Sequence, residues 1–149
     1  MTRKLASLAE LARVLSQNGR KAVVQAEAGL MQAAVLIQDD AKNRIGGMGG
    51  ETPDDWAPLS AATEARKVEL GQDDAPLVGS GALRDSIVIE HEGKTVAVGS
   101  TLDVAAWQEF GTATIPPRPF LGPALMASEE KIVKLVGERA AAVLAGEER

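Results

Sequence analysis

Few residues in this chain could carry acid–base or nucleophilic chemistry. His91 is the single histidine, and cysteine is absent. A hydrolytic triad could be drawn from Ser80 or Ser86 with His91 and Asp103, but no G-x-S-x-G nucleophile elbow supports it. A solvent-exposed imidazole beside the turn of a hairpin is the simpler interpretation of His91. We therefore expect no catalytic residues and no enzyme, and keep a small hydrolase that uses His91 as an alternative.

Paired carboxylates are the second candidate for chemistry, because adjacent aspartates can bind Ca²⁺ or Mg²⁺. Such pairs occur at Asp39-Asp40, Asp54-Asp55 and Asp73-Asp74, and their spacing matches no EF-hand loop. We interpret the first pair as a solvated helix face and the others as polar loop residues. The run "GGMGG" at residues 46–50 is not followed by the Gly-Lys-Ser/Thr of a phosphate-binding loop. We expect no metal site and no cofactor.

One segment concentrates the residue types that are rare elsewhere. Between Trp107 and Leu125 lie three of the four aromatic residues and four of the seven prolines. Proline fixes φ and lacks a backbone N–H, so Pro116, Pro117 and Pro119 should hold residues 115–120 extended and stiff. We name these six residues, "IPPRPF", the proline arm.

The side chains around the proline arm have two interpretations. Arg118 presents a fork of donors suited to a carboxylate, and aromatic side chains are large hydrophobic anchors. In the first interpretation, Trp107, Phe110 and Phe120 fill the domain's own core beneath the hairpin, and Arg118 forms a surface or intrachain ion pair. In the second, part of this cluster packs against a neighbouring subunit, where aromatics and arginine are frequent hot spots. The sequence leaves both open.

Helical periodicity predicts the first elements that position this segment. Apolar residues three or four apart indicate a short helix around residues 5–15, which Asn18-Gly19 should end. A longer helix is predicted over residues 23–45, about 35 Å in length. Because much of the apolar content is alanine and few residues are aromatic, the core should depend on close helix contacts.

Glycine and proline interrupt this pattern and predict a loop-rich excursion over residues 46–82. Its first part, residues 46–58, is expected to be a mobile loop. Ser60 is placed to cap a short helix, and residues 82–86 suggest a single helical turn.

The second half of the chain is predicted to begin with a β-hairpin. Alternating apolar residues place two strands within residues 86–100, with Glu92-Gly93 at the turn. A short helix capped by Asp103 and ended by Gly111 follows, although Val104 and Trp107 could instead continue a sheet edge. A last helix runs over about residues 123–145. This order predicts an α+β fold in which a small antiparallel sheet packs against long N-terminal and C-terminal helices.

Length and charge limit the number of domains and the classes of partner that the chain could have. A chain of 149 residues suits one domain, 1–149, that includes the excursion. A net charge of −5 argues against a general DNA or RNA binder, which needs a basic surface. We expect no signal peptide and no membrane partner, and synthesis in a reducing cytoplasm.

The segment "VAAWQEFGTATIPPRPFLGPAL" resembles the closing signature of the tail-component, or neck, proteins of long-tailed bacteriophages. Their pattern joins "A-x-x-x-E-F-G-T", "x-P-x-R-P-F-L" and "P-A-L". The matching positions are Trp107, Glu109, Phe110, Gly111, Thr112, Pro117, Arg118, Pro119, Phe120, Leu121, Pro123, Ala124 and Leu125. Upstream, "LVGSGALRDSI" and "TVAVGS" are similar to the steps before and within the family's hairpin, although Ser80 stands where threonine is commoner. "WAPLSAATEARK" from Trp56 resembles the tail-completion proteins of Mu-like phages.

This resemblance implies a structural virion protein with an α+β fold that assembles as a homo-oligomeric ring near the head–tail junction. It is made in the cytoplasm of the host bacterium. The implied partners are further copies of the chain, a head-closure or connector protein, and a tail terminator or tail-tube protein. Genomic DNA would pass without specific binding. A non-virion assembly chaperone is the main alternative.

Two sets of residues are expected to serve that assembly. The residues expected to anchor the arm or form the interface are Trp107, Glu109, Phe110, Gly111, Pro116, Pro117, Arg118, Pro119 and Phe120. Those expected to order when the loop meets an adjoining ring are Gly46, Gly47, Gly49, Gly50 and Trp56.

Overall fold

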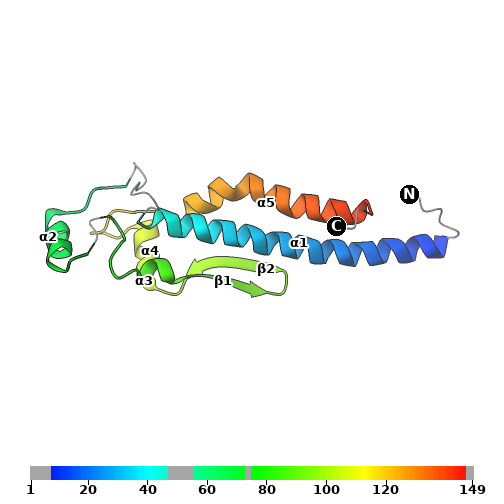
Figure 1. The fold of residues 1–149 in the computed structure, drawn as a ribbon, viewed down its shortest axis with the longest axis horizontal. Helices are drawn as coiled ribbons and strands as arrows, with labels where there is room; N and C mark the ends of the chain where they lie inside the picture. Colours follow the sequence, from blue (N-terminus) through cyan, green and yellow to red (C-terminus); the bar gives the residue numbers. More distant parts are fainter. Residues whose placement is uncertain (1–7, 47–55, 73–74, 147–149) are drawn as a thin grey trace. The chain divides into compact units, whose positions relative to one another are not determined.

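The computed structural model describes residues 8–46, 56–72 and 75–146 of the chain (Figure 1). Its elements are α1 (Leu8–Arg44), α2 (Ala61–Glu69), α3 (Ala82–Asp85), β1 (Ile87–Glu92), β2 (Thr95–Ser100), α4 (Asp103–Phe110) and α5 (Leu121–Leu144). Two long helices and an antiparallel hairpin confirm the predicted α+β fold. The chain divides into two compact units, which we name the helical unit (Met1–Ala33 with Glu129–Arg149) and the hairpin unit (Ala34–Ser128). Both draw on α1 and α5, and the single-domain organisation stays a prediction.

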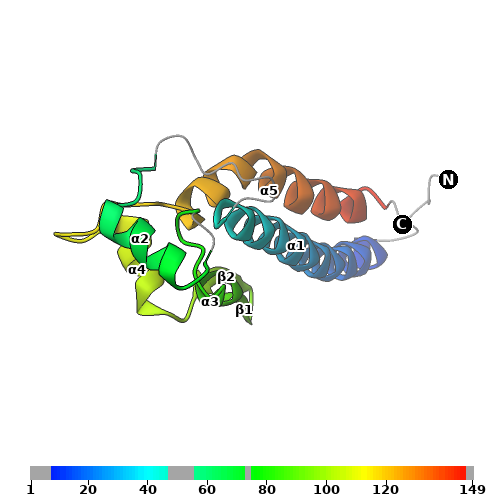
Figure 2. The same ribbon diagram turned by 60° about the vertical axis from the view of Figure 1, so that its left-hand side comes forward.

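The helical unit joins the first part of α1 to the last part of α5, which lie side by side in both views (Figures 1 and 2). Small residues occupy the contact, where Ala22 and Ala33 are buried. A Cβ added at Gly29 would lie 2.9 Å from the carbonyl oxygen of Leu135. Two helix backbones can approach this closely only where a side chain is missing. The alanine-rich composition therefore serves close helix packing, as predicted.

α1 continues without a break through Asn18-Gly19, where the sequence predicted one helix to end and another to follow. That prediction was wrong. Gly19 is not among the glycines with positive φ, so it does not form the left-handed stop. A glycine inside a helix costs only about 1 kcal/mol relative to alanine. Cooperative helix formation by the residues on both sides outweighs this cost.

The hairpin unit contains β1 and β2, which pair antiparallel from Ile87 opposite Ser100 to Glu92 opposite Thr95. The two-residue turn is therefore Gly93-Lys94, one position later than predicted. Gly93 has a φ of 58°, as the tight turns that match strand twist require. From α1, the side-chain amide of Gln38 donates to the carbonyl of Ile87 at 2.7 Å. This bond fixes the start of β1 against the helix.

The core of the hairpin unit collects residues from segments far apart in the sequence. Phe120 and Ile87 are the largest fully buried side chains. The other buried hydrophobic residues of this unit are Ala34, Ile37, Ala41, Ile45, Trp56, Leu83, Ala105 and Ala124. The segment just before α5 therefore supplies the largest fully buried side chain of this core.

The short helices begin and end close to the predicted residues. Ser60 caps α2 by accepting from the N–H of Thr63 at 3.3 Å, as predicted. α3 is the predicted single turn. α4 ends at Gly111 as predicted, but its N-cap is Leu102 and Asp103 is its first helical residue. Asp103 therefore contributes charge to the first turn instead of a cap.

Candidate functional site

The carboxylate of Glu109, near the end of α4, holds the start of α5. Its oxygens accept from the N–H groups of Phe120, Leu121 and Gly122 at 2.8, 2.9 and 2.7 Å. The next residue, Pro123, has no N–H to satisfy. One carboxylate and one proline thus account for the donors that a helix leaves unpaired at its N-terminus, and negative charge lies at the positive helix end. α5 accordingly begins two residues before the predicted Pro123.

A tight turn brings the proline arm back onto α4. Gly111 has a φ of 75°, and a Cβ there would lie 3.0 Å from the carbonyl oxygen of Ile115. The N–H of Thr112 donates to that same carbonyl at 2.8 Å, which closes the turn. The N–H of Arg118 then donates to the carbonyl of Gln108 at 2.6 Å. Both the backbone conformation and the space at position 111 therefore require glycine.

The guanidinium of Arg118 is buried and binds backbone carbonyls, not the carboxylate that the sequence suggested. Nη2 donates to the carbonyls of Ala57 and Pro58 at 2.8 and 3.2 Å, and Nε donates to that of Ala57 at 3.2 Å. In return, Nε1 of Trp56 donates to the carbonyl of Pro119 at 3.3 Å. The proline arm and the segment that begins at Trp56 are thus bound to each other in both directions.

The aromatic side chains of this region have different surroundings. Phe120 is fully buried, whereas Trp107 is 51% and Phe110 80% exposed. The first interpretation from the sequence therefore does not describe the whole cluster, because Phe120 fills the core while Trp107 and Phe110 stay open. The second, in which part of the cluster contacts a neighbouring subunit, stays a prediction. Trp107 and Phe110 are three apart in α4 and so share one side of the helix. We name this pair the aromatic face of α4.

The remaining predicted site residues lie in the arm and the loop. Pro116 and Pro117 are exposed and Pro119 is half-buried. Among the loop residues, Gly47, Gly49 and Gly50 lie outside the described part of the chain. Gly46 follows α1 with a φ of 80°, and a Cβ there would collide with the side chain of Val78. Trp56 is already buried within the single chain, so its own placement needs no partner. Ordering of the loop on assembly stays a prediction.

Sequence reasoning named Glu109 but missed its role as the cap of α5. A signal for that role was present. Phe120 stands at the N-cap position, where serine, threonine, aspartate or asparagine is usual. A helix start without a local cap needs an acceptor from elsewhere in the chain.

The structure does not assemble the triad considered from the sequence. Ser86 precedes β1 and His91 lies five residues further on, so the strand separates them by about 16 Å. The hydroxyl of Ser86 is bonded within 2.6 Å to the carbonyl of Leu83 and to the hydroxyl of Ser100. The hydroxyl of Ser80 accepts from the N–H of Ala82 at 3.4 Å. The serines therefore have structural partners.

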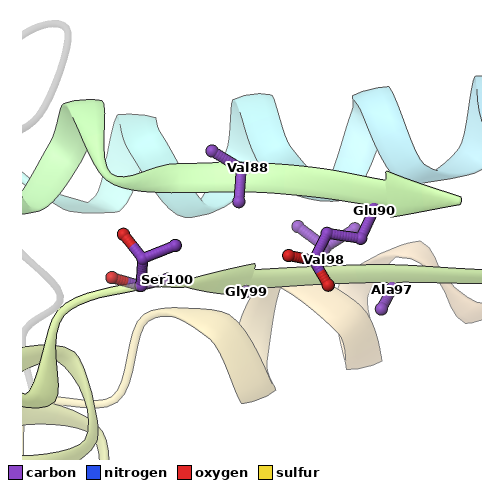
Figure 3. A pocket seen from close by; sticks show the side chains of 7 residues that line it. Val88, Glu90, Ala97, Val98, Gly99 and Ser100 are labelled. Carbon is purple, nitrogen blue, oxygen red and sulfur yellow. The ribbon is translucent and has the colours of Figure 1, made fainter.

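A small open hollow on the hairpin offers no reactive pair. It is lined by Val88 and Glu90 of β1 and by residues 97–101, with Glu90 as its ionisable group (Figure 3). Within the described residues, no three His, Asp or Glu side chains come together as a metal site would need. Asp40 instead pairs with Arg44 at 3.2 Å.

The other two aspartate pairs, Asp54-Asp55 and Asp73-Asp74, lie outside the described residues. In the part of the chain that the structure describes, no helix is long and apolar enough to cross a membrane.

Comparison with known proteins places the chain in a family. Residues 8–111 match the family model described as "Bacteriophage HK97-gp10, putative tail-component". The chain is also 37% identical over 87 residues to "Uncharacterized protein MJ0331" of Methanocaldococcus jannaschii. That alignment covers 54% of this chain and 64% of the relative, so the chain spans less than two thirds of the relative's length. No solved structure matches.

The family match runs from α1 to the glycine that ends α4 and includes Trp56 and the hairpin. It confirms the resemblance to phage tail components, a structural class of virion protein, while residues 112–125 of the motif lie beyond the matched range. The chain belongs to the HK97-gp10-like family of bacteriophage tail components.

Proposed function

We propose that this chain is a structural subunit that forms a ring at the head–tail junction, as a neck or tail-completion protein. Its membership of a tail-component family supports a structural role in the virion. The proposed neighbours are further copies of the chain, a head-closure or connector protein on one side, and a tail terminator or tail-tube protein on the other. Genomic DNA passes through the ring without being specifically bound.

The aromatic face of α4 is the observation that carries this proposal. Large aromatic side chains are usually buried, yet Phe110 is 80% and Trp107 51% exposed. Aromatic residues are enriched in subunit interfaces and often supply most of the binding energy. The face is therefore suited to contact with another protein surface.

The contacts beneath this face keep it in a fixed position. Glu109, between the two aromatic residues in sequence, is bonded to the start of α5, and the carbonyl of Gln108 is bonded to Arg118. A surface that is already ordered loses less conformational entropy on binding. The proline arm accordingly supports the interface from within the subunit, and the exposed aromatics make the contact.

The acidic charge of the chain suits a ring through which DNA moves. A net charge of −5 repels phosphate groups, so a lumen formed by such subunits lets the genome slide. In a closed ring each subunit presents one face to a different face of its neighbour. The aromatic face of α4 is one member of that pair of surfaces.

Electron microscopy of the purified protein and of phage particles tests the proposal. We expect rings from the wild type, located at the head–tail junction of the particle. The double variant Trp107→Ser/Phe110→Ser should lose the rings while its free energy of unfolding stays close to that of the wild type, because both side chains are exposed. Val133→Ser is the matched control, since Val133 is 69% exposed on another helix and should leave the rings intact.

Three outcomes would contradict the proposal. Rings that persist in the aromatic double variant would show that the aromatic face of α4 does not form the contact between subunits. Absence of the protein from finished particles would favour the assembly-chaperone alternative. Location elsewhere in the tail would keep the structural role and exclude the junction.

A further inference from the structure

The hairpin formed by β1 and β2 has an outer edge on each strand. In an antiparallel pair, successive residues point their backbone groups alternately toward the partner strand and away from it. Because a two-residue turn is closed by a hydrogen-bonded pair, Glu92 and Thr95 point their backbone groups at each other. Their neighbours His91 and Val96 therefore point theirs outward, and so does every second residue from there along each strand.

Most of these outward groups have no partner. The carbonyl of Ile87 accepts from Gln38, which agrees with the alternation, since Ile87 lies four residues before His91. In the part of the chain that the structure describes, no hydrogen bond from outside the hairpin reaches the backbone of Ile89, His91, Val96 or Val98. Both edges thus carry open donors and acceptors.

Neither strand has the features that usually protect an open edge. Soluble proteins discourage strand addition with proline, lysine or a β-bulge on the edge strand. β1 reads IVIEHE and β2 reads TVAVGS, without proline or lysine, and their register runs through without a bulge. A sheet of two strands is also marginally stable by itself. Both edges are therefore suited to pairing with a further strand.

The side of the hairpin that meets α1 is incompletely covered. Ile87 is buried, whereas Ile89, Val96 and Val98 on the same side are only half-buried. Opposite and diagonal side chains on adjacent strands cover one another. A strand added at each edge would complete the burial of these apolar side chains.

The charges of β1 select which edges pair. The side of the hairpin that points away from α1, which we name the open face, carries Glu90 and Glu92, and both are exposed. β2 contains no charged residue. Pairing β1 with β1 of a second copy would bring carboxylates together across the strands, which destabilises a sheet. Pairing β1 with β2 of a second copy places them beside Thr95 and Ala97 instead.

We propose that β2 of one copy pairs antiparallel with β1 of the next, so that the hairpins of the ring form one continuous sheet. Neighbours related by rotation about the ring axis repeat the order β1, β2, β1, β2, which makes the joint antiparallel like the hairpin itself. The two edges are different surfaces, as a closed ring requires, whereas pairing of β2 with β2 would give a dimer. This inference rests on the proposed function, because it needs copies arranged in a ring, and it adds a second contact to the aromatic face of α4.

The continuous sheet turns its open face toward the lumen. The opposite side is occupied by the part of α1 that belongs to the hairpin unit, as the bond from Gln38 shows. Figure 3 shows Glu90 and Ala97 of the two strands at the hollow on the hairpin. The carboxylates of Glu90 and Glu92 then face passing DNA and repel its phosphates. About eight strands make a barrel filled by its own side chains, so the ring needs more than about four copies to leave a channel.

Disulfide formation between single-cysteine variants produced together tests the joint, since the chain has no cysteine of its own. Glu90→Cys should form linked dimers with Ala97→Cys, because both side chains lie on the open face of adjacent strands. Thr95→Cys and Gly99→Cys cover a joint shifted by two residues in either direction. His91→Cys is the matched control, since His91 is also exposed but points to the other side, and it should not link to these variants. Equal linkage of Glu90→Cys and His91→Cys, or no linkage of Glu90→Cys with any β2 variant, would overturn the proposal.

Two substitutions at His91 give an independent readout. Proline removes the outward N–H that the joint needs and the hairpin does not, and edge strands tolerate it. Sedimentation analysis should show self-association weakened at least about tenfold in His91→Pro and unchanged in His91→Ala. An unfolding midpoint close to that of the wild type would show that the hairpin is intact. Equal association of the two variants would contradict the proposal, as would linkage of Ala97→Cys in phage particles only to a different virion protein.

The two proposals fail in separable ways. Rings at the junction without linkage between Glu90→Cys and any β2 variant would leave the proposed function standing and remove the joint between strands. Linkage at the strands without rings at the junction would do the reverse.

Discussion

The contacts inside the helical unit differ in kind from those inside the hairpin unit. In the helical unit, small residues at regular spacing let two helix backbones meet, as at Gly29 and Leu135. In the hairpin unit, single side chains such as Glu109 and Arg118 bind backbone groups of irregular segments. Regular packing spreads its stabilisation over many residues, whereas the second kind concentrates it in a few. The hairpin unit should therefore be the more sensitive to single substitutions.

The largest expected effect comes from Phe120→Ala in the hairpin unit. Phe120 is fully buried, and removing a buried phenylalanine side chain should lower the free energy of unfolding by about 3–5 kcal/mol. Urea denaturation measures this change. Phe110→Ala is the control from the same motif, and its exposed side chain should leave stability within about 0.5 kcal/mol of the wild type. Equal losses from both would mean that the two aromatics share one environment.

Glu109→Gln should have the next largest effect. The glutamine side chain keeps one acceptor oxygen, loses the negative charge at the start of α5, and turns an N–H donor toward backbone N–H groups. We expect a loss of about 2 kcal/mol, since hydrogen bonds to charged groups are the stronger ones. Glu130→Gln, an exposed position in α5, should change stability little. A similar loss at both positions would show that general charge, and not the cap, is responsible.

The contrast between the units also explains which parts of the fold the sequence could predict. The hairpin, the Ser60 cap and the last helix follow from spacing within a few residues, and those predictions are confirmed. The predicted break at Asn18-Gly19 was wrong, because a local stop signal was considered without the tendency of the residues on both sides to form one continuous helix. Local patterns thus predict elements well, but they predict the ends of elements less well.

The candidate site could be predicted only in part, because its contacts are long-range. The motif singled out Glu109, Arg118 and Phe120 as residue types. It could not show that Arg118 binds the carbonyls of Ala57 and Pro58. Every residue has a backbone carbonyl, so residue types do not indicate which carbonyls accept a hydrogen bond. Nor could it separate a buried Phe120 from an exposed Phe110, because both are apolar residues of one motif.

Two glycines of the helical unit have opposite surroundings. One lies in the close contact between helices, and the other lies on an open helix surface. An added Cβ at Gly29 would press on the α5 backbone, whereas at Gly137 it would meet nothing within 4 Å. Gly29→Ala should therefore destabilise by about 1–2 kcal/mol, overpacking exceeding the gain in helix propensity. Gly137→Ala should stabilise by about 0.5–1 kcal/mol. Thermal denaturation followed by circular dichroism distinguishes them, and stabilisation by both would contradict the close contact.

The smallest expected effect decides whether α1 is one helix. An added Cβ at Gly19 would meet nothing within 4 Å, so Gly19→Ala should stabilise the chain by about 0.5–1 kcal/mol through helix propensity alone. If Asn18-Gly19 instead ended a helix with a left-handed glycine, alanine would be strained there and the same substitution would destabilise. Because the two structures predict opposite signs, even a small shift in the unfolding midpoint, measured at low protein concentration, separates a continuous α1 from two helices.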